Sequence, residues 1–277
     1  NDVTVRAETL PLDGDELRAS LTDYDAALPT LGDLYTADVF ADVGQPRAKL
    51  LANFGVGYNH IDVAAAKAAS VLVTNTPGAV TDATADTAMP LILMTARRAG
   101  EGERLVRAGK WPGWHPTQML GLHVSGKTLG VIGMGRIGKA IAHRCQAGFG
   151  MKVVFFNRSA VADPGVDGTQ LASSEEVCAA ADIVVVAVPG GPATRHLIGT
   201  SAFAAMQPQA HFINIARGDV VDEAALIAAL QAGEIGGAGL DVYEFEPKVP
   251  DALIQMENVT LLPHLGTACL EVREDMG

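Results

Sequence analysis

The chain has 277 residues, of which 48% are hydrophobic and 19% are charged, and its formal net charge at pH 7 is -12. This length and composition exclude a disordered or fibrous protein and allow one large or two ordinary domains with a hydrophobic core. The acidic balance has no compensating run of Lys or Arg, so we expect no general affinity for nucleic acid or for an anionic membrane surface.

No stretch approaches the roughly 18 consecutive apolar residues that a membrane helix needs. The N-terminal segment NDVTVRAETL has no basic region leading into an apolar one. The three cysteines, Cys145, Cys178 and Cys269, are widely spaced and form no C-x-x-C pair. We expect them to be small buried hydrophobes in a reducing cytoplasm rather than disulfide partners or metal ligands. The sequence therefore predicts a soluble, unprocessed cytoplasmic protein with no metal site.

Apolar runs rich in Val and Ile alternate with Ala-rich helical patterns along the chain. The expected strands lie at 49–53, 71–74, 128–132, 152–156, 182–188, 211–215, 237–242 and 259–262, and the expected helices include 62–69, 83–109, 137–148, 173–180 and 222–232. Because parallel strands need helical crossovers and are buried on both faces, this alternation predicts an α/β fold with parallel sheets covered by helices. The opening VTVR is typical of a strand, and the closing CLEVREDMG is typical of the first turns of a helix.

A break in composition falls at residues 109–127 (GKWPGWHPTQMLGLHVSGK), where Gly, Pro and both tryptophans cluster before a new strand begins. Such clusters interrupt regular structure and mark boundaries between compact regions. We interpret this segment as a connector that leads from a long helix into a second domain.

A glycine motif follows the connector. TLGVIGMGRIGKAIAHRC has a strand pattern, then Gly133-x-Gly135-x-x-Gly138, then a helix pattern, and the strand KVVFF comes next. The first glycine allows a tight turn, the second lets a pyrophosphate approach the backbone, and the third lets the helix pack closely on the strand. The helix N-terminus supplies free N–H groups and the positive end of its dipole. A strand before the motif, and a helix and a second strand after it, predict a dinucleotide site rather than a plain Gly-rich turn. The site includes Arg136 and Ile137, which lie inside the motif.

The residues after the second strand bear on which dinucleotide binds. An Asp or Glu there would accept hydrogen bonds from a ribose 2′-hydroxyl and repel a 2′-phosphate, but this chain has Asn157, Arg158 and Ser159. A neutral amide, a guanidinium and a hydroxyl suit a phosphate monoester, to which Arg158 can make charge-assisted hydrogen bonds. We therefore predict NADP(H) as the preferred cofactor, with NAD(H) possible; the alternative is an Arg solvated at the tip of a loop.

Four polar residues follow three later strands. Arg217 follows the strand in INIARGDVVDE, Asp241 and Glu246 lie in GLDVYEFEP, and His264 lies in LLPHLGTA. Ligands bind at the carboxyl ends of strands in open α/β sheets, so we expect these side chains to converge. An Arg can hold the carboxylate of a 2-oxo acid, while a His beside a carboxylate can give a proton to the oxygen that becomes an alkoxide. Each residue taken singly also suits a purely structural role.

Together these motifs resemble those of the D-isomer-specific 2-hydroxyacid dehydrogenases, in particular the glyoxylate/hydroxypyruvate reductase branch. The similarity spans nearly the whole chain in the family's order, and the matching stretches are NFGVGYNHID (53–62), VTNTPG (73–78), WPGWHPTQMLG (111–121), GKTLGVIGMGRIG (126–138), INIARGDVVDE (213–223), GLDVYEFEP (239–247) and PHLGTA (263–268). The loop at Asn157–Ser159 also resembles that of the NADP-preferring members.

The resemblance implies roles for individual residues. His264 is implied to be the acid/base, Glu246 its partner and Arg217 the substrate anchor. Backbone N–H groups of Val56 and Gly57 are implied to bind the substrate carboxylate. Further cofactor contacts are implied for Val188, Pro189, Ala216, Asp241, which approaches the nicotinamide carboxamide, and Gly266.

The resemblance also implies an architecture of two Rossmann-like domains. A doubly wound, parallel-sheet dinucleotide-binding domain at 91–264 would be inserted into a discontinuous flavodoxin-like substrate domain at 1–90 and 265–277. Family members begin with a preceding strand and end with a longer helix, so we expect the substrate domain to be incomplete at both ends. Closure of the cleft would exclude water from the reaction. A homodimer through residues 83–109 and the connector is also implied.

The leading interpretation is an enzyme that reduces a small 2-oxo acid with NADPH, glyoxylate or hydroxypyruvate and by extension 2-ketogluconate, with His264 as proton donor. One alternative is NAD-linked oxidation of a D-2-hydroxy acid such as D-lactate or D-3-phosphoglycerate, and another is a nucleotide-sensing protein without turnover. The other histidines lack metal-ligand spacing and suit surface or packed roles; they are His60, His115, His123, His143, His196 and His211. His115, beside Trp111 and Trp114, could also border the substrate pocket.

Overall fold

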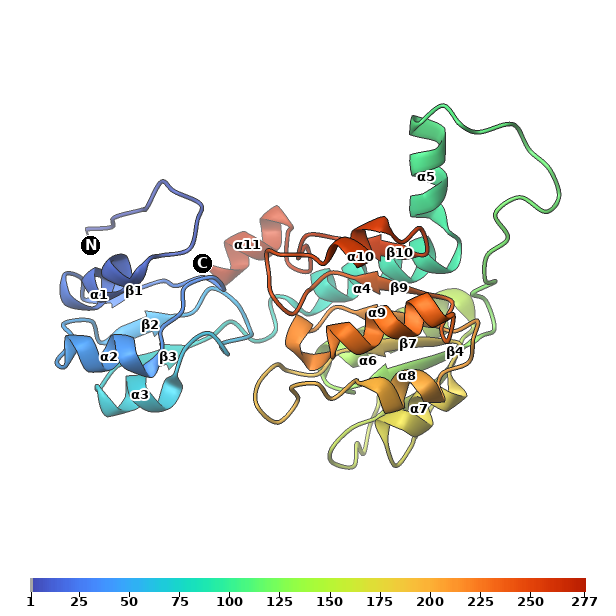
Figure 1. Cartoon of the computed structure of the whole chain (residues 1–277). Helices are drawn as coiled ribbons and strands as arrows, with labels where there is room; N and C mark the ends of the chain where they lie inside the picture. Colours follow the sequence, from blue (N-terminus) through green and yellow to red (C-terminus); the bar gives the residue numbers. More distant parts are fainter. Residues whose placement is uncertain (1) are drawn as a thin grey trace. The chain divides into compact units, whose positions relative to one another are not determined.

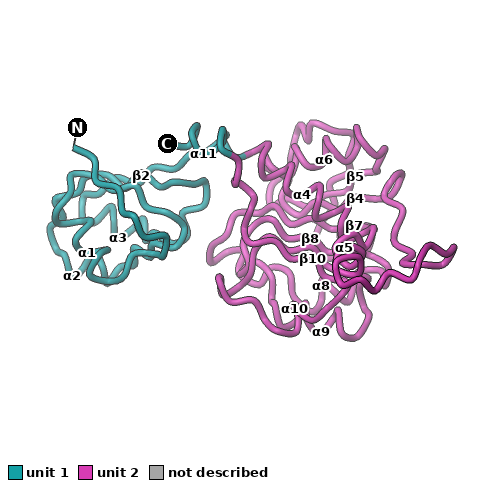
Figure 2. Tube along the Cα trace, turned by 90° about the horizontal axis from the view of Figure 1, so that it is seen from above, with its two compact units in different colours: residues 1–80, 270–277 teal, residues 81–269 magenta. Residues whose placement is uncertain are grey.

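The computed structural model describes residues 2–277, and the chain divides into two compact units (Figure 1, Figure 2). Unit 1 comprises residues 1–80 and 270–277, and unit 2 comprises residues 81–269. The borders expected from the family resemblance lie at 90/91 and 264/265. The first border lies earlier because the helix that begins at Thr81 buries Ala85, Leu91 and Ile92 in the core of unit 2.

Unit 1 is a small α/β unit built on a three-stranded parallel sheet in the order β1-β2-β3. Its elements are α1 (Gly14–Thr22), β1 (Ala26–Ala27), α2 (Ala37–Val43), β2 (Leu50–Ala52), α3 (Val63–Ala68), β3 (Leu72–Thr74) and α11 (Leu270–Met276). Leu21, Tyr35 and Leu51 are fully buried in its core.

Unit 1 contains three elements that the sequence did not predict, α1, β1 and α2, and it lacks one expected strand. The expected strand at VTVR is wrong, since residues 3–6 form no strand and the side chains of Val3 and Val5 are 80% and 83% exposed. Within residues 2–277 no strand pairs with this segment. Helix α1 was not assigned, although its capping box was readable in the sequence: the Asp13 carboxylate accepts from the Asp15 and Glu16 N–H groups, and Glu16 accepts from the Asp13 N–H.

Unit 2 contains a seven-stranded sheet in the order β10-β9-β8-β7-β4-β5-β6, in which every neighbouring pair is parallel. The strands are β4 (Thr128–Ile132), β5 (Lys152–Phe156), β6 (Gly168–Gln170), β7 (Ile183–Val186), β8 (His211–Asn214), β9 (Gly237–Leu240) and β10 (Val259–Leu261). The chain runs outward from β4 through β5 to β6 and then returns to β7 on the other side of β4. The predicted α/β fold with parallel sheets is confirmed, and the switch point between β4 and β7 is where ligands bind in such sheets.

Helices cover both faces of this sheet (Figure 1). They are α4 (Thr81–Ala96), α5 (Ala99–Arg107), α6 (Arg136–Phe149), α7 (Ser174–Ala180), α8 (Thr200–Ala205), α9 (Glu223–Ala232) and α10 (Asp251–Gln255), with a short 3₁₀ turn at Gly218–Val220. Successive residues of a strand point to opposite faces, so Phe212 joins one core and Ile213 joins the other. This double burial explains why the strands read as unbroken apolar runs.

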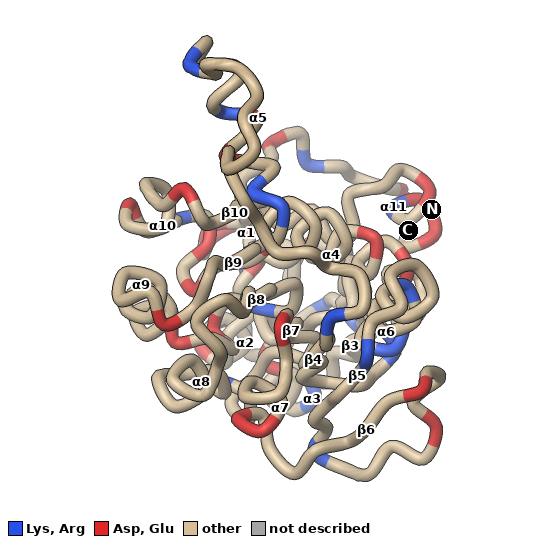
Figure 3. The backbone as a smooth tube through the Cα atoms, turned by 90° about the vertical axis from the view of Figure 1, so that its right-hand side faces the viewer, with Lys and Arg blue, Asp and Glu red and all other residues tan. Residues whose placement is uncertain are grey.

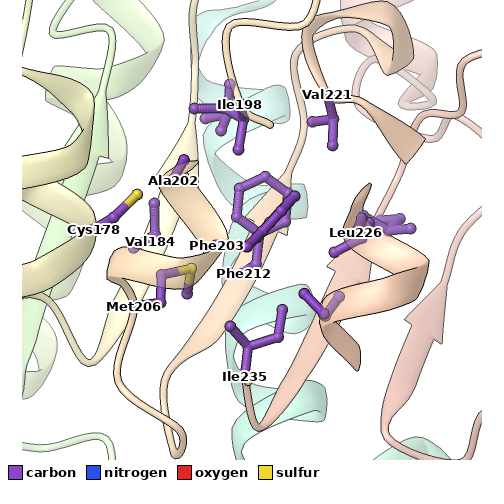
Figure 4. Close-up of a cluster of buried hydrophobic side chains, with 14 of the residues drawn as sticks. Cys178, Val184, Ile198, Ala202, Phe203, Met206, Phe212, Val221, Leu226 and Ile235 are labelled. Atoms are coloured by element: carbon purple, nitrogen blue, oxygen red, sulfur yellow. The ribbon is translucent and has the colours of Figure 1, made fainter. Parts of the chain in front are cut away.

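The core on one face is formed by α7, α8 and α9 against the sheet (Figure 4). Phe203 of α8 meets Phe212 of β8 edge to face, with ring centroids 5.2 Å apart and an interplanar angle of 82°. Both side chains are fully buried. Aromatic pairs in this geometry contribute beyond the area that they bury.

The single helix predicted at 83–109 is wrong, because the chain forms α4 and α5 with a break between them. Arg98 adopts a left-handed conformation with φ of 53° and pairs with Glu101. The N–H of Leu122 donates to the carbonyl of Ala96 at 2.7 Å and so takes an acceptor that a continuing helix would need. This contact joins residues distant in sequence, and for that reason the local pattern did not reveal the break.

Helix α5 and the segment that follows it stand away from the rest of unit 2 (Figure 1). Helix α5 has no buried residue. Positions of Lys and Arg occur along the backbone together with those of Asp and Glu (Figure 3). Across residues 2–277, every helix is too short or too polar to cross a membrane.

Candidate active site

The predicted glycine motif forms the turn between β4 and α6. Gly133 has φ of 103°, and a Cβ there would lie 2.8 Å from the carbonyl carbon of Ala187. A Cβ on Gly138 would lie 2.1 Å from the Gly133 oxygen. Gly135 caps α6, and beyond its own neighbours in the chain no atom of the described residues comes within 4 Å of the position of its missing Cβ. The turn therefore leaves open space in front of a long helix N-terminus, a cradle that fits the pyrophosphate of a dinucleotide.

The other predicted cofactor residues follow the carboxyl ends of neighbouring strands. Because the seven strands are parallel, these ends share one edge of the sheet. Asn157 follows β5, Val188 and Pro189 follow β7, Ala216 follows β8, and Asp241, His264 and Gly266 follow β9 and β10. The structure thus collects at one edge the residues that the sequence placed after separate strands.

Glu246 and His264 are in direct contact. The His264 Nδ1 lies 2.8 Å from Glu246 Oε2, while Glu246 Oε1 accepts a hydrogen bond of 3.0 Å from the Tyr243 N–H. Burial alone would raise the pKa of Glu246. The hydrogen bond and charge of His264, the Tyr243 N–H and the charge of Arg217 outweigh it and hold that pKa below its ordinary value. The carboxylate is therefore ionised at neutral pH and faces one nitrogen of the ring.

Asp241 holds the loop that carries His264. Its carboxylate is buried and accepts hydrogen bonds from the N–H groups of Leu265 at 2.6 Å and Gly266 at 2.8 Å. Its backbone carbonyl accepts the His264 N–H at 2.9 Å, and His264 has φ of 55°. Burial raises the pKa of Asp241. The family resemblance implies that Asp241 lies at the cofactor. Its contacts with Leu265 and Gly266 could not be predicted from the sequence, because they join the end of β9 to the loop after β10.

Arg217 lies directly beyond β8, partly buried, and its Nη1 donates to the Ala216 carbonyl at 2.7 Å. Burial lowers the pKa of the guanidinium, while the negative charges of Glu246 and Asp219 act in the opposite sense. The buried Asn214 shapes this turn, since its amide donates to the Arg217 carbonyl and accepts from the Ala216 N–H, both at 3.0 Å. Arg217 is thus a cation held within the electrostatic reach of Glu246.

Gly218 explains why the turn of Arg217 lies so near Glu246. A Cβ on Gly218 would lie 1.8 Å from the carbonyl carbon and oxygen of Tyr243. The two backbone segments therefore pass each other with no room for a side chain between them. Sequence reasoning missed this contact, although a glycine directly after a candidate catalytic Arg was a signal.

The predicted cofactor-selecting loop follows β5. The Asn157 amide donates to the carbonyl of Ser159 at 3.1 Å, and the Arg158 side chain is exposed. Within residues 2–277 no group pairs with the Arg158 guanidinium. Its charge is available to an external anion.

In unit 1, Val56 and Gly57 lie in the loop after β2. The Asn53 amide donates to the carbonyls of Gly55 at 2.9 Å and Gly57 at 3.1 Å, and the Asn75 amide donates to that of Val56 at 2.8 Å. No carbonyl or side chain of residues 2–277 accepts from the Val56 or Gly57 N–H. The sequence did not reveal the role of the two asparagines, which hold this loop while the Val56 and Gly57 N–H groups stay available to a ligand.

A cavity of about 530 Å³ lies elsewhere in unit 2. Its lining includes His211, Gly236 and Asn258, which lie at the amino-terminal ends of β8, β9 and β10. None of the predicted site residues lines it. It is therefore at the opposite edge of the sheet from the groups described above.

Known proteins of one family are similar to this chain. The family model described as "D-isomer specific 2-hydroxyacid dehydrogenase, NAD binding domain" matches residues 89–266. A glyoxylate reductase of Pyrococcus furiosus is 41% identical over 280 residues, which cover 99% of this chain and 82% of that protein.

Solved structures are similar to this chain over nearly its whole length. An NADPH-dependent glyoxylate/hydroxypyruvate reductase of Sinorhizobium meliloti, in complex with NADP and malonate, has a TM-score of 0.86 at 37% identity and covers 95% of this chain and 81% of its own. A D-mandelate dehydrogenase of Rhodotorula graminis has a TM-score of 0.84 at 32% identity and covers 96% of this chain and 82% of its own. Proteins with different named substrates thus share this fold.

The close approach at Gly218 predicts a large effect of Gly218→Ala. The new methyl group would overlap the Tyr243 backbone, and we expect a loss of about 2–3 kcal/mol in the free energy of unfolding, measured by urea titration. Gly148→Ala is the matched control, because it lies in α6 with open space at its Cβ and should stabilise by up to about 1 kcal/mol. Equal stability of Gly218→Ala and the parent would contradict the described contact.

Proposed function

Because the chain belongs to the D-isomer specific 2-hydroxyacid dehydrogenase family, we propose that it reduces a small 2-oxo acid, glyoxylate or hydroxypyruvate first of all, with NADPH. The family makes the chain an NAD(P)-dependent oxidoreductase. The observation that carries the proposal is the Glu246–His264 pair, with Arg217 within its electrostatic reach. A carboxylate, an imidazole and a guanidinium are the groups that reduction of a 2-oxo acid requires.

Each of these three groups has a distinct task. When bound, the nicotinamide supplies a hydride to the carbonyl carbon of the substrate. Arg217 holds the substrate carboxylate and polarises the neighbouring carbonyl. His264 donates a proton from Nε2 to the carbonyl oxygen, while Glu246 faces Nδ1 and orients the ring. Asp241 keeps His264 in place by accepting hydrogen bonds from the backbone N–H groups of the two residues that follow it, Leu265 and Gly266.

The glycine turn and the loop after β5 are the parts of the chain that would hold the cofactor. Gly133, Gly135 and Gly138 shape the open turn at the N-terminus of α6. Arg158 would meet the 2′-phosphate of NADPH. The Val56 and Gly57 N–H groups could bind a carboxylate oxygen. We place the enzyme in the cytoplasm, where its three free cysteines stay reduced.

The proton donor gives the most direct test of turnover. His264→Ala should lower kcat for hydroxypyruvate at least about 100-fold, since general acid catalysis contributes about 10²–10⁴-fold. NADPH affinity, measured by fluorescence titration, should stay within about twofold because the cofactor cradle is untouched. A nucleotide sensor without turnover would show no reduction in the parent either, and full activity of the variant would contradict the assigned role.

The assignment of NADPH predicts a specific response to Arg158→Ala. The parent should have a higher kcat/KM with NADPH than with NADH. The variant should lose about tenfold or more with NADPH, as expected for lost charge-assisted hydrogen bonds worth about 1.5–3 kcal/mol. Its kcat/KM with NADH should change little. A parent that prefers NADH would overturn the cofactor assignment in favour of NAD-linked chemistry.

The pairing of Glu246 with His264 predicts a loss of activity in Glu246→Gln. Because the pKa of Glu246 is held low, its carboxylate is ionised at neutral pH and faces Nδ1 of the ring. The substitution keeps the shape of the side chain and removes that negative charge, so kcat for hydroxypyruvate at neutral pH should fall about tenfold or more. Steady-state assays with NADPH measure this change, and an unchanged kcat would contradict the pairing.

We also propose that two copies of the chain form a dimer through α5 and the segment after it. The apolar side chains of Val106, Trp111, Trp114 and Leu120 are between 54% and 79% exposed there. Exposed apolar surface of this kind marks interfaces. Sedimentation equilibrium should give twice the 28.8 kDa of one chain.

A charge placed in this surface provides the control for the dimer. Trp111→Asp should shift the sedimenting mass toward the monomer, whereas Leu28→Asp, at a 56% exposed position in unit 1, should not. A monomeric parent at micromolar concentration would refute the interface.

A further inference from the structure

The side-chain amide of Gln170 forms all its hydrogen bonds with the loop after β5. Its Nε2 donates to the carbonyls of Asn157 and Ser159, both at 3.1 Å, and its Oε1 accepts from the Val161 N–H at 3.0 Å. A glutamine amide has two N–H donors and one oxygen. All three functions of this amide are therefore used to hold one short segment of backbone.

Gln170 is itself anchored to the sheet. It is the last residue of β6, and its backbone pairs with Phe155 of β5 in parallel register. The N–H of Leu171 donates to the carbonyl of Phe155 at 2.8 Å. The loop of Asn157 begins directly after β5, so the amide ties the loop to the same strand pair from which it leaves.

The residue between the two held carbonyls is Arg158. Its side chain is exposed and no protein group pairs with its guanidinium within residues 2–277. The position from which the Arg158 side chain extends is therefore set by the backbone on either side and not by contacts of the side chain. A long side chain loses rotamer entropy when it binds an anion, and fixing its backbone lowers the remaining cost of binding.

We propose that Gln170 is a positioning residue that sets the preference for NADPH over NADH by holding the loop of Arg158. The inference rests on the proposed function, in which Arg158 meets the 2′-phosphate. NADH has no such phosphate, so it gains little from an ordered Arg158. The amide of Gln170 therefore acts on the discrimination between the two cofactors and leaves the chemistry at His264 alone.

The test uses Gln170→Met, which keeps the length of the side chain and removes its hydrogen bonds. Gln146→Met is the matched control, because Gln146 also holds a nearby backbone turn: its amide donates to the Asp167 carbonyl at 2.8 Å and accepts from the Asp167 N–H at 3.1 Å. The affinities of the full-length chain for NADP⁺ and NAD⁺ are measured by titration calorimetry.

We expect Gln170→Met to weaken NADP⁺ binding about tenfold relative to NAD⁺, as for the loss of about 1.4 kcal/mol. Gln146→Met should leave the ratio of the two affinities unchanged. An unchanged ratio in Gln170→Met, or an equal change in Gln146→Met, would overturn the inference. Retained NAD⁺ affinity reports that the variant is folded. Should Gln170→Met lose both affinities, Gln170→Asn, which keeps an amide too short to reach all three groups, must lower the ratio or the inference fails.

A second arm separates this inference from the proposed cofactor. In the Arg158→Ala background, Gln170→Met should no longer change the ratio, because the residue through which it acts is gone. The parent ratio alone tests the NADPH assignment. A parent that favours NAD⁺ would end that assignment, while a ratio that falls in Gln170→Met only when Arg158 is present would still establish the positioning role.

Discussion

The proposed catalytic groups depend on two backbone segments that pass each other without a side chain between them. Gly218 lies against the carbonyl of Tyr243, and this contact brings the turn of Arg217 beside the turn of Glu246. The Tyr243 N–H then fixes one oxygen of Glu246, and the other oxygen faces His264. A guanidinium, a carboxylate and an imidazole from three loops thereby become one electrostatic unit. The parallel sheet supplies the common edge, and the close backbone contact supplies the spacing.

Much of this arrangement could be predicted from the sequence because its signals are local. The apolar runs mark the strands of unit 2, and the glycine motif marks the turn after β4 through the steric needs of Gly133 and Gly138. These assignments also predict where the strands end. Because the strands are parallel, their carboxyl ends form the common edge that carries Glu246 and His264. Their convergence at one edge could therefore be predicted from local patterns, whereas the pairing of these two residues was implied by the resemblance to the family.

The features that escaped prediction depend on contacts between distant segments. The break between α4 and α5 needs the Leu122 N–H at the Ala96 carbonyl, which no local pattern reports. The clamp of Asp241 on Gly266 and the hold of Gln170 on its loop join elements that only the folded sheet brings together. Their side chains are ordinary in the sequence, and their meaning comes from where their hydrogen bonds end. Local physics thus predicts the elements, while the fine positioning of the site belongs to tertiary structure.

In the proposed mechanism, Glu246 holds His264 with Nδ1 toward the carboxylate and Nε2 free for the substrate. The ¹⁵N chemical shifts of the His264 ring, assigned in histidine-labelled protein with His264→Asn as reference, report which nitrogen carries the proton. We expect a proton on Nδ1 in the neutral ring and loss of this preference in Glu246→Gln. A neutral ring protonated on Nε2 in the parent would contradict it.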